Sequence, residues 1–346
     1  MAMTNERFNE ILEQNFDFGY EVRVSSSGEI NNYDSQTGYK LTDQTKSMVQ
    51  SLKVLSLTDK GEELLESLDP NTKIGMYHLK DKFDENGNKI SGLGEHCGNN
   101  IAAYESGIRQ GVFGLSSTLF HELIHEKQRQ DGINSGLCDE PQNAFMIDKL
   151  QEAEARIKTA EFAEQLKNGA VACGIKEEKV SEQMKSCVNE DMSSIVNLTS
   201  SGLSEEEVNR EMLKKVYNDE RWNEAYNEQA LINADFENYS NTKNMYREKL
   251  KDQNGMSDAE MFEQMMYRMS LKKEDAQYFA DPQNISAFPS ERFAKNNETQ
   301  ADDRAQMKAN LGNNLSGVSC EEVAQVETQP KVNVAQMAMN NIGGRW

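Results

Sequence analysis

The stretch Ser116–Gly132, "SSTLFHELIHEKQRQDG", combines the clearest helical pattern in the chain with its most distinctive chemistry. Four apolar residues fall within one arc at 100° per residue: Leu119, Phe120, Leu123 and Ile124. A serine at either of the first two positions can cap the helix start, and the closing Asp-Gly pair can end it. The stretch therefore predicts an amphipathic helix with His121 and His125 together at the edge of its buried stripe.

His121, Glu122 and His125 form the short motif H-E-x-x-H. Histidines at positions i and i+4 lie on one helical face, where both rings can reach one zinc ion. The glutamate that follows the first histidine can take a proton from a zinc-activated water. We therefore predict a Zn²⁺ site with His121 and His125 as ligands and Glu122 as the general base.

A catalytic zinc needs a third protein ligand and an open position. The chain has four histidines, and the other two, His78 and His96, lie upstream of the motif, so the metzincin pattern with a third downstream histidine is excluded. The methionines near residues 261–269 are then interpreted as core residues at helical spacing, not as a Met-turn. A carboxylate is the remaining choice for the third ligand.

A second helix is predicted over residues 144–166, ending at Asn168-Gly169. Its apolar face has 3–4 spacing and contains Met146, Leu150, Ala153, Ile157 and Ala160. Glu152 and Glu154 lie about 200° apart on this helix, so only one of them can face a metal. Both flank the apolar face, and periodicity alone leaves the choice between them open.

This part of the chain resembles the gluzincins, the thermolysin-like zinc peptidases. Their third ligand is a glutamate on a later helix, followed three residues on by a small residue and then by Asp or Asn. Glu152-x-x-Ala155 matches that phrase, so the resemblance implies Glu152 as the third ligand, with Glu154 as the alternative. Arg156 departs from it, because the family residue there braces a zinc-bound histidine; Glu154 or another residue would have to take over that role.

Residues 73–169 also resemble a bacterial family of uncharacterised metallopeptidase-like proteins, through the two short motifs and "QLKNG" at the end of the second helix. The resemblance implies that an antiparallel edge strand before the motif helix, "NNIAAYES" at residues 99–106, binds extended peptide by strand addition.

The wider pattern predicts an α+β fold: a zincin-like core with a small antiparallel sheet and an active-site helix, followed by a mostly helical C-terminal region. We expect an entry segment over residues 1–70, the core over 71–175, a helical region over 176–309 and a flexible tail over 310–346. Residues 42–69 have helical spacing with a break at Gly61, and residues 73–81 alternate like a strand. Capping boxes at Ser204–Glu207 and Ser257–Glu260 predict two later helix starts.

Bulk composition limits the partners. The net charge of −21 disfavours nucleic acid and anionic membranes. No apolar run is long enough to span a bilayer, and the N-terminus lacks a secretory signal pattern. Five cysteines without a C-x-x-C pair indicate reduced thiols. We therefore expect a cytoplasmic protein, although a specialised secretion system would need no such signal, and we make no prediction of its oligomeric state.

The sequence thus predicts a zinc metallopeptidase that acts on a protein or peptide substrate. One alternative is a zinc-binding but weakly catalytic zincin scaffold that serves as a regulatory or interaction module, an option that Arg156 raises. Another is a helical interaction protein with an accidental motif. His78 and His96 are weaker site candidates, and Arg221 and Tyr226 are weaker candidates for oxyanion stabilisation.

Overall fold

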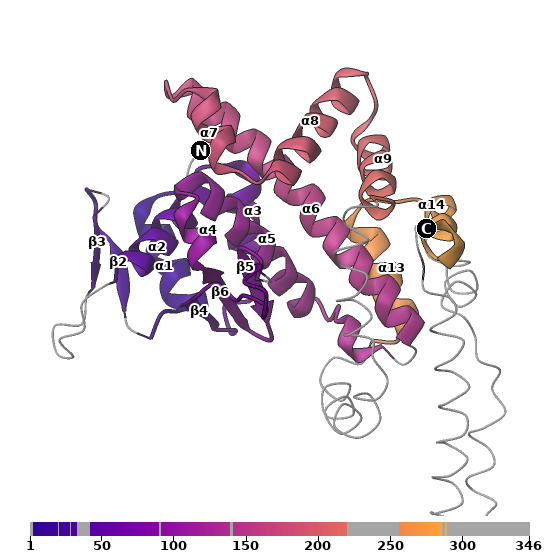
Figure 1. Cartoon of the computed structure of the whole chain (residues 1–346), viewed down its shortest axis with the longest axis horizontal. Helices are drawn as coiled ribbons and strands as arrows, with labels where there is room; N and C mark the ends of the chain where they lie inside the picture. Colours follow the sequence, from indigo (N-terminus) through magenta and orange to yellow (C-terminus); the bar gives the residue numbers. More distant parts are fainter. Residues whose placement is uncertain are drawn as a thin grey trace, which may run out of the picture. The chain divides into compact units, whose positions relative to one another are not determined.

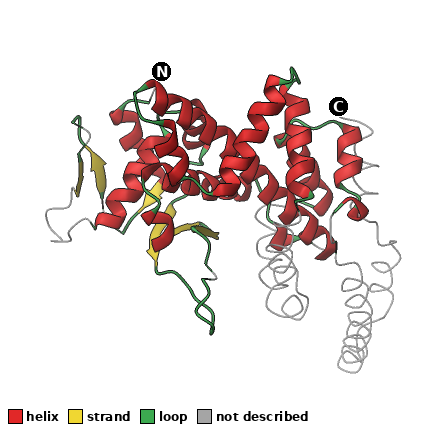
Figure 2. Cartoon of the chain, turned by 45° about the horizontal axis from the view of Figure 1, so that its top comes forward, coloured by secondary structure: helices red, strands yellow, loops and turns green. Residues whose placement is uncertain are grey.

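The computed structural model describes residues 3–19, 21–27, 29–32, 42–89, 91–138, 141–219, 256–285 and 288. Helices make up most of this part, and the fold is mixed α/β (Figures 1 and 2). The N-terminal elements are α1 (Asn5–Asn15), β1 (Phe16–Asp17), β2 (Val22–Val24), β3 (Ile30–Asn32), α2 (Asp43–Leu55), α3 (Asp59–Ser67), β4 (Ile74–Leu79), β5 (Gly94–Cys97) and β6 (Asn100–Tyr104). They are followed by α4 (Glu105–Arg109), α5 (Val112–Gln130), η1 (Ser135–Leu137), α6 (Pro141–Ala172), α7 (Glu177–Gln183), α8 (Ser186–Ser200), α9 (Glu205–Tyr217), α13 (Asp258–Arg268), α14 (Lys273–Phe279) and η3 (Pro282–Asn284).

The chain divides into two compact units. Unit 1 combines residues 1–131 with 151–213, and unit 2 combines residues 132–150 with 214–346. The sheets and the H-E-x-x-H helix α5 belong to unit 1. Helix α6 contributes its first ten residues to unit 2 and the remainder to unit 1.

The main sheet of unit 1 has four strands in the order β1-β4-β6-β5. Strand β4 pairs in parallel with both β1 and β6, and only β5 is antiparallel to its neighbour. The expected small antiparallel sheet is therefore mixed. The expected edge strand, residues 99–106, is also placed differently, because β6 lies between β4 and β5, and β5 forms the edge.

Helix α5 begins earlier than the sequence indicates. Its N-cap is Gly111 at φ 90°, so the expected caps Ser116 and Ser117 lie inside the helix. There their hydroxyls donate to carbonyls one turn back, at 2.6 Å to Val112 and 3.1 Å to Phe113. The predicted end is confirmed, with Asp131 as the C-cap and Gly132 at φ 83°.

The helical break predicted at Gly61 instead lies at residues 56–58, between α2 and α3. Thr58 caps α3, and Gly61 lies inside that helix. A Cβ atom at Gly61 would lie 2.1 Å from the carbonyl oxygen of Leu55. The glycine therefore permits close packing of α3 against the end of α2 and does not end a helix.

Helix α6 extends beyond both predicted ends, to Pro141–Ala172, and runs through Gly169. Its five predicted apolar positions are all buried, at 5% exposure or less. In unit 1, Phe120 of α5 stacks on Phe162 of α6 with ring centroids 4.5 Å apart. Further along α5, Gln128 contacts Gln151, which lies earlier on α6 than Phe162 does. The two helices therefore run in opposite directions.

Both predicted capping boxes are present, at the starts of α9 and α13. In unit 2, the four predicted core methionines are buried: Met261, Met265, Met266 and Met269. Asn143 donates to the Asp258 carboxylate at 2.8 Å, which joins the start of α6 to α13 within this unit.

Among the described cysteines, Cys97 and Cys173 are exposed free thiols. Within the described part of the chain, no helix combines the length and apolar character that a membrane crossing requires. The predicted tail over 310–346 and the candidates Arg221 and Tyr226 lie outside the described residues. The predicted domain boundaries stay predictions.

Candidate metal centre

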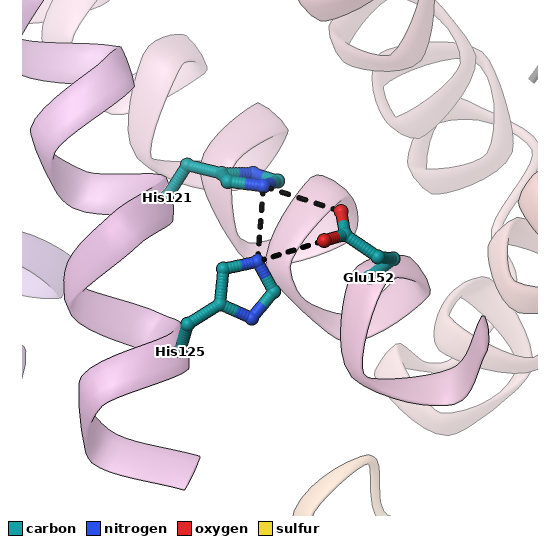
Figure 3. A group of neighbouring side chains, drawn as sticks. All are labelled: His121, His125 and Glu152. Carbon is teal, nitrogen blue, oxygen red and sulfur yellow. Dashed lines mark hydrogen bonds and ion pairs between the residues drawn. The ribbon is translucent and has the colours of Figure 1, made fainter. Parts of the chain in front are cut away.

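The three residues predicted as zinc ligands come together in unit 1, on the facing sides of α5 and α6 (Figure 3). The Nε2 atom of His125 lies 3.2 Å from Nε2 of His121 and 3.2 Å from Oε1 of Glu152. Nε2 of His121 lies 3.4 Å from Oε2 of Glu152. Two imidazole nitrogens and one carboxylate thus converge on one point.

This donor set fits zinc. Two ligand atoms at tetrahedral zinc, each with a bond of 2.0–2.1 Å, lie about 3.3 Å apart. The two imidazole nitrogens here are 3.2 Å apart, which is close to that value, and each of them faces a different oxygen of the Glu152 carboxylate, at 3.2 and 3.4 Å. Nitrogen and carboxylate donors also suit zinc chemically, and three protein ligands leave the fourth position that catalysis requires.

The electrostatics of the metal-free group favour a protonated histidine. Burial opposes the charged form of His125, but the nearby Glu152 carboxylate outweighs it and raises the pKa of His125 to about 10. Burial likewise opposes ionisation of Glu152, yet His125 and His121 hold the pKa of this carboxyl well below its usual value. The metal-free site is therefore an ion pair, with its carboxylate already ionised for a cation.

Glu122, the predicted base, lies on α5 next to the edge strand and is 8% exposed. A Cβ atom at Gly94 of β5 would lie 2.9 Å from Oε1 of Glu122. The Glu122 carboxylate therefore occupies space that any other residue at position 94 would fill. The absence of a side chain at Gly94 lets the predicted base lie directly against the edge strand.

The other glutamate on α6, Glu154, faces a different partner. It is 1% exposed, accepts from Nε2 of Gln128 at 2.8 Å and pairs with Lys158 at 2.7 Å. Oε1 of Gln128 in turn lies 2.9 Å from Nδ1 of His125. Glu154 is thus linked to His125 through Gln128, on the Nδ1 side of the ring, whereas Glu152 faces Nε2 of the same ring.

Arg156, which departs from the gluzincin phrase, points to α8 instead of the metal group. Its guanidinium donates to Asp191 at 2.8 and 3.0 Å. This ion pair joins α6 to α8 within unit 1. Gln128, and not Arg156, is the residue that contacts Nδ1 of His125.

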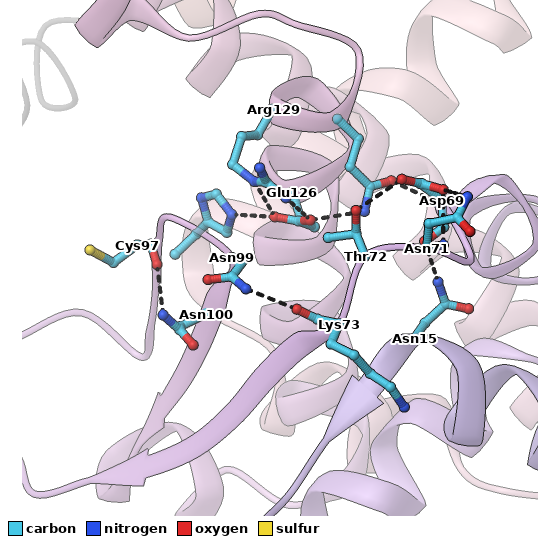
Figure 4. Close-up of polar contacts among 12 residues, drawn as sticks. Asn15, Asp69, Asn71, Thr72, Lys73, Cys97, Asn99, Asn100, Glu126 and Arg129 are labelled. Atoms are coloured by element: carbon cyan, nitrogen blue, oxygen red, sulfur yellow. Dashed lines mark hydrogen bonds and ion pairs between the residues drawn. The ribbon is translucent and has the colours of Figure 1, made fainter. Parts of the chain in front are cut away.

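His96, a weaker candidate, lies on β5 beside the metal group. Its ring stacks on that of His125 with centroids 6.3 Å apart, and its Nε2 lies 2.9 Å from Oε2 of Glu126. Glu126 is fully buried and also accepts from Arg129 (Figure 4). It accepts a further hydrogen bond from Gln130. Burial opposes ionisation of Glu126, but the hydrogen bonds from Arg129 and His96 outweigh it and lower the pKa of this carboxyl.

Two features of this site were absent from the sequence-based prediction: the bridging role of Gln128 and the buried carboxylate of Glu126. A signal exists for Gln128, because it follows His125 at helical spacing of three. None exists for the pairing of Glu126 with His96, which depends on how β5 lies on α5. His78 is exposed on β4.

Comparison of the chain with protein-family models, curated proteins and solved structures finds no match. The assignment of a function therefore depends on the residues and their geometry.

Proposed function

We propose that the chain is a zinc-dependent peptidase of the gluzincin type, with His121, His125 and Glu152 as ligands and Glu122 as the general base. The observation that carries the proposal is that the side chains of His121, His125 and Glu152 converge at separations typical of zinc ligands. Glu122, the proposed base, lies on α5 beside His121. The zincin-like description of the core belongs to the same proposal. Its support is a mixed sheet with an antiparallel edge strand packed on the H-E-x-x-H helix.

Zinc in such a site supplies Lewis acidity, which lowers the pKa of water to about 7. Glu122 accepts a proton from the water whose oxygen attacks the peptide carbonyl carbon. It then delivers that proton to the nitrogen of the leaving amine as the carbon–nitrogen bond breaks. Water is consumed, two peptides are released, and no covalent intermediate with the protein forms.

Strand β5 is the element best placed to hold the substrate. As an edge strand it offers backbone groups to an extended peptide, which would add to the sheet beside Glu122. This replaces β6, the strand expected from the sequence, in the proposed role. A protein or peptide is the partner that such an edge fits.

Metal analysis is the direct test. Wild-type protein prepared with excess zinc and then desalted is expected to retain about one zinc per chain, and His125→Ala and Glu152→Ala are expected to lose most of it, because each removes a ligand. Glu122→Gln should keep the metal and lose hydrolysis of a mixed peptide library. Absence of zinc from the wild type would reject the metal site.

The same experiment separates the alternative, a zinc-binding module with little catalysis. That alternative requires zinc in the wild type and equal, near-zero hydrolysis in wild type and Glu122→Gln. Its original support was Arg156, and the pairing of Arg156 with Asp191 weakens it.

A further inference from the structure

The side-chain amide of Gln128 has only one orientation that satisfies its neighbours. Its Nε2 lies 3.0 Å from the Gln151 backbone carbonyl and 2.8 Å from the Glu154 carboxylate, and both of these groups accept hydrogen bonds. The amide nitrogen must therefore face them. Its oxygen must then face Nδ1 of His125, at 2.9 Å.

This orientation determines where His125 carries its proton. An amide oxygen can only accept, so Nδ1 of His125 must be the donor. In the neutral ring the lone pair then lies on Nε2, the atom that faces His121 and Glu152. The buried carboxylate of Glu154, paired with Lys158, secures the amide by giving its NH₂ group a charged acceptor.

We propose that Gln128 is a positioning residue for the metal centre, oriented by Glu154, and that the pair replaces the bracing residue whose position Arg156 occupies. The inference rests on the proposed zinc site and concerns how that site is held. Gln128 acts through His125 and touches neither metal nor substrate. Two helices contribute to the brace, since Gln128 lies on α5 and Glu154 on α6.

The test measures zinc dissociation constants at one pH by competition with a chromophoric chelator. Gln128→Met removes the acceptor and is expected to weaken zinc binding about 10- to 100-fold, the usual effect of losing such a supporting contact. The matched control is Gln130→Met, on the same helix, whose amide donates to Glu126 and accepts from the backbone N–H of Asp69 instead of bonding to His125. It should change the zinc affinity less than about threefold, well below the range for supporting contacts.

A double-mutant cycle tests the relay itself. Glu154→Gln conserves shape and should weaken zinc binding by less than Gln128→Met does. Combined with Gln128→Met it should cause no further loss, because Glu154 acts on the metal through Gln128. If Gln128→Met does not fold, Glu154→Gln alone carries the test.

A spectroscopic reading separates positioning from general destabilisation. In the zinc-loaded wild type, the Nδ1–H proton of His125 should be slow to exchange and visible by NMR, and it should be lost in Gln128→Met and kept in Gln130→Met. Equal zinc affinity in wild type and Gln128→Met, or an equal loss in Gln130→Met, would overturn the inference. Failure of the wild type to bind zinc would instead reject the proposed function.

Discussion

At the scale of single residues, the choice between Glu152 and Glu154 shows what a helical pattern can and cannot decide. Their angular separation implies that one of them faces the histidines, and the family phrase favours Glu152. The structure places Glu152 against both rings and Glu154 against Gln128. The role of Gln128 could be predicted only in part, because its spacing of three from His125 is visible in the sequence, whereas its contacts with Gln151 and Glu154 depend on how α5 packs on α6.

The proton on His125 leads to a prediction about pH. The pKa of this residue is raised from 6.5 to about 10 in the metal-free protein, so zinc must displace a proton at neutral pH. Apparent zinc affinity should therefore rise about tenfold per pH unit between about pH 6 and 8. Calorimetry in buffers of different ionisation enthalpy should detect about one proton released per zinc.

The raised pKa of His125 has the opposite effect on the stability of the metal-free protein, which should decrease as the pH rises. A raised pKa means that the His125–Glu152 pair stabilises the protein fully below pH 6.5 and that this contribution is lost as the pH rises through about 10. Zinc binding should thus strengthen over the pH range in which the metal-free pair weakens. A zinc affinity independent of pH would contradict this account of the site.

At the scale of elements, β5 is the feature that a local reading of the sequence missed. The resemblance to gluzincins implied that residues 99–106, just before the motif helix, form the edge strand, and residues 100–104 do form β6. Strand order is set by long-range pairing, however, and the short segment Gly94–Cys97 adds outside β6. Its glycine and histidine then face α5, which no periodicity in so short a segment could indicate.

The contact of Gly94 with Glu122 leads to a second prediction. Gly94→Ala would place Cβ atoms 2.9 Å from Oε1 of Glu122 and 2.8 Å from Cγ2 of Thr118, so the base must move. We expect the zinc content to remain unchanged and kcat to fall about 10- to 100-fold, because small displacements of a reacting group slow catalysis by factors of this size. Gly169→Ala, on α6 in open space, is the matched control and should leave kcat unchanged. An unchanged kcat in Gly94→Ala would mean that catalysis does not depend on the contact between the Glu122 carboxylate and Gly94.

The contact of His96 with Glu126 leads to a third prediction, on stability. This is the hydrogen bond that ties β5 to α5 through a fully buried carboxylate. His96→Ala should lower the free energy of unfolding of the metal-free protein by about 1.5–3 kcal/mol, the range for hydrogen bonds to charged groups. Urea denaturation would measure it, with Cys97→Ala, the exposed next residue, expected within about 0.5 kcal/mol of wild type. Equal effects of the two substitutions would argue against an anchoring role.

At the scale of the whole molecule, the sequence divides the chain into consecutive segments, whereas the contacts join distant ones. Residues 132–150 belong with 214–346, and residues 151–213 belong with the N-terminal part. A contact such as that of Asn143 with Asp258 joins residues far apart in the chain, and local composition contains no trace of it. A unit that combines distant segments in this way cannot be recognised from the order of the elements along the chain.

All the proposed ligands lie in unit 1, and this leads to a prediction about where zinc acts. A ligand that binds only the folded state stabilises it by an amount that grows with concentration, about 2.7 kcal/mol at 100 times the dissociation constant. Amides of α5 and of residues 151–172 should therefore exchange hydrogen about 100-fold more slowly with zinc at that concentration. If the two units open independently, the exchange rates of the amides of α13 and α14 should not change.

Hydrogen exchange read by mass spectrometry would measure both regions in one sample, with His125→Ala as the control that shows no zinc effect. Equal slowing in α13 would show that the units open together, and slowing confined to α13 would place the metal outside the proposed centre.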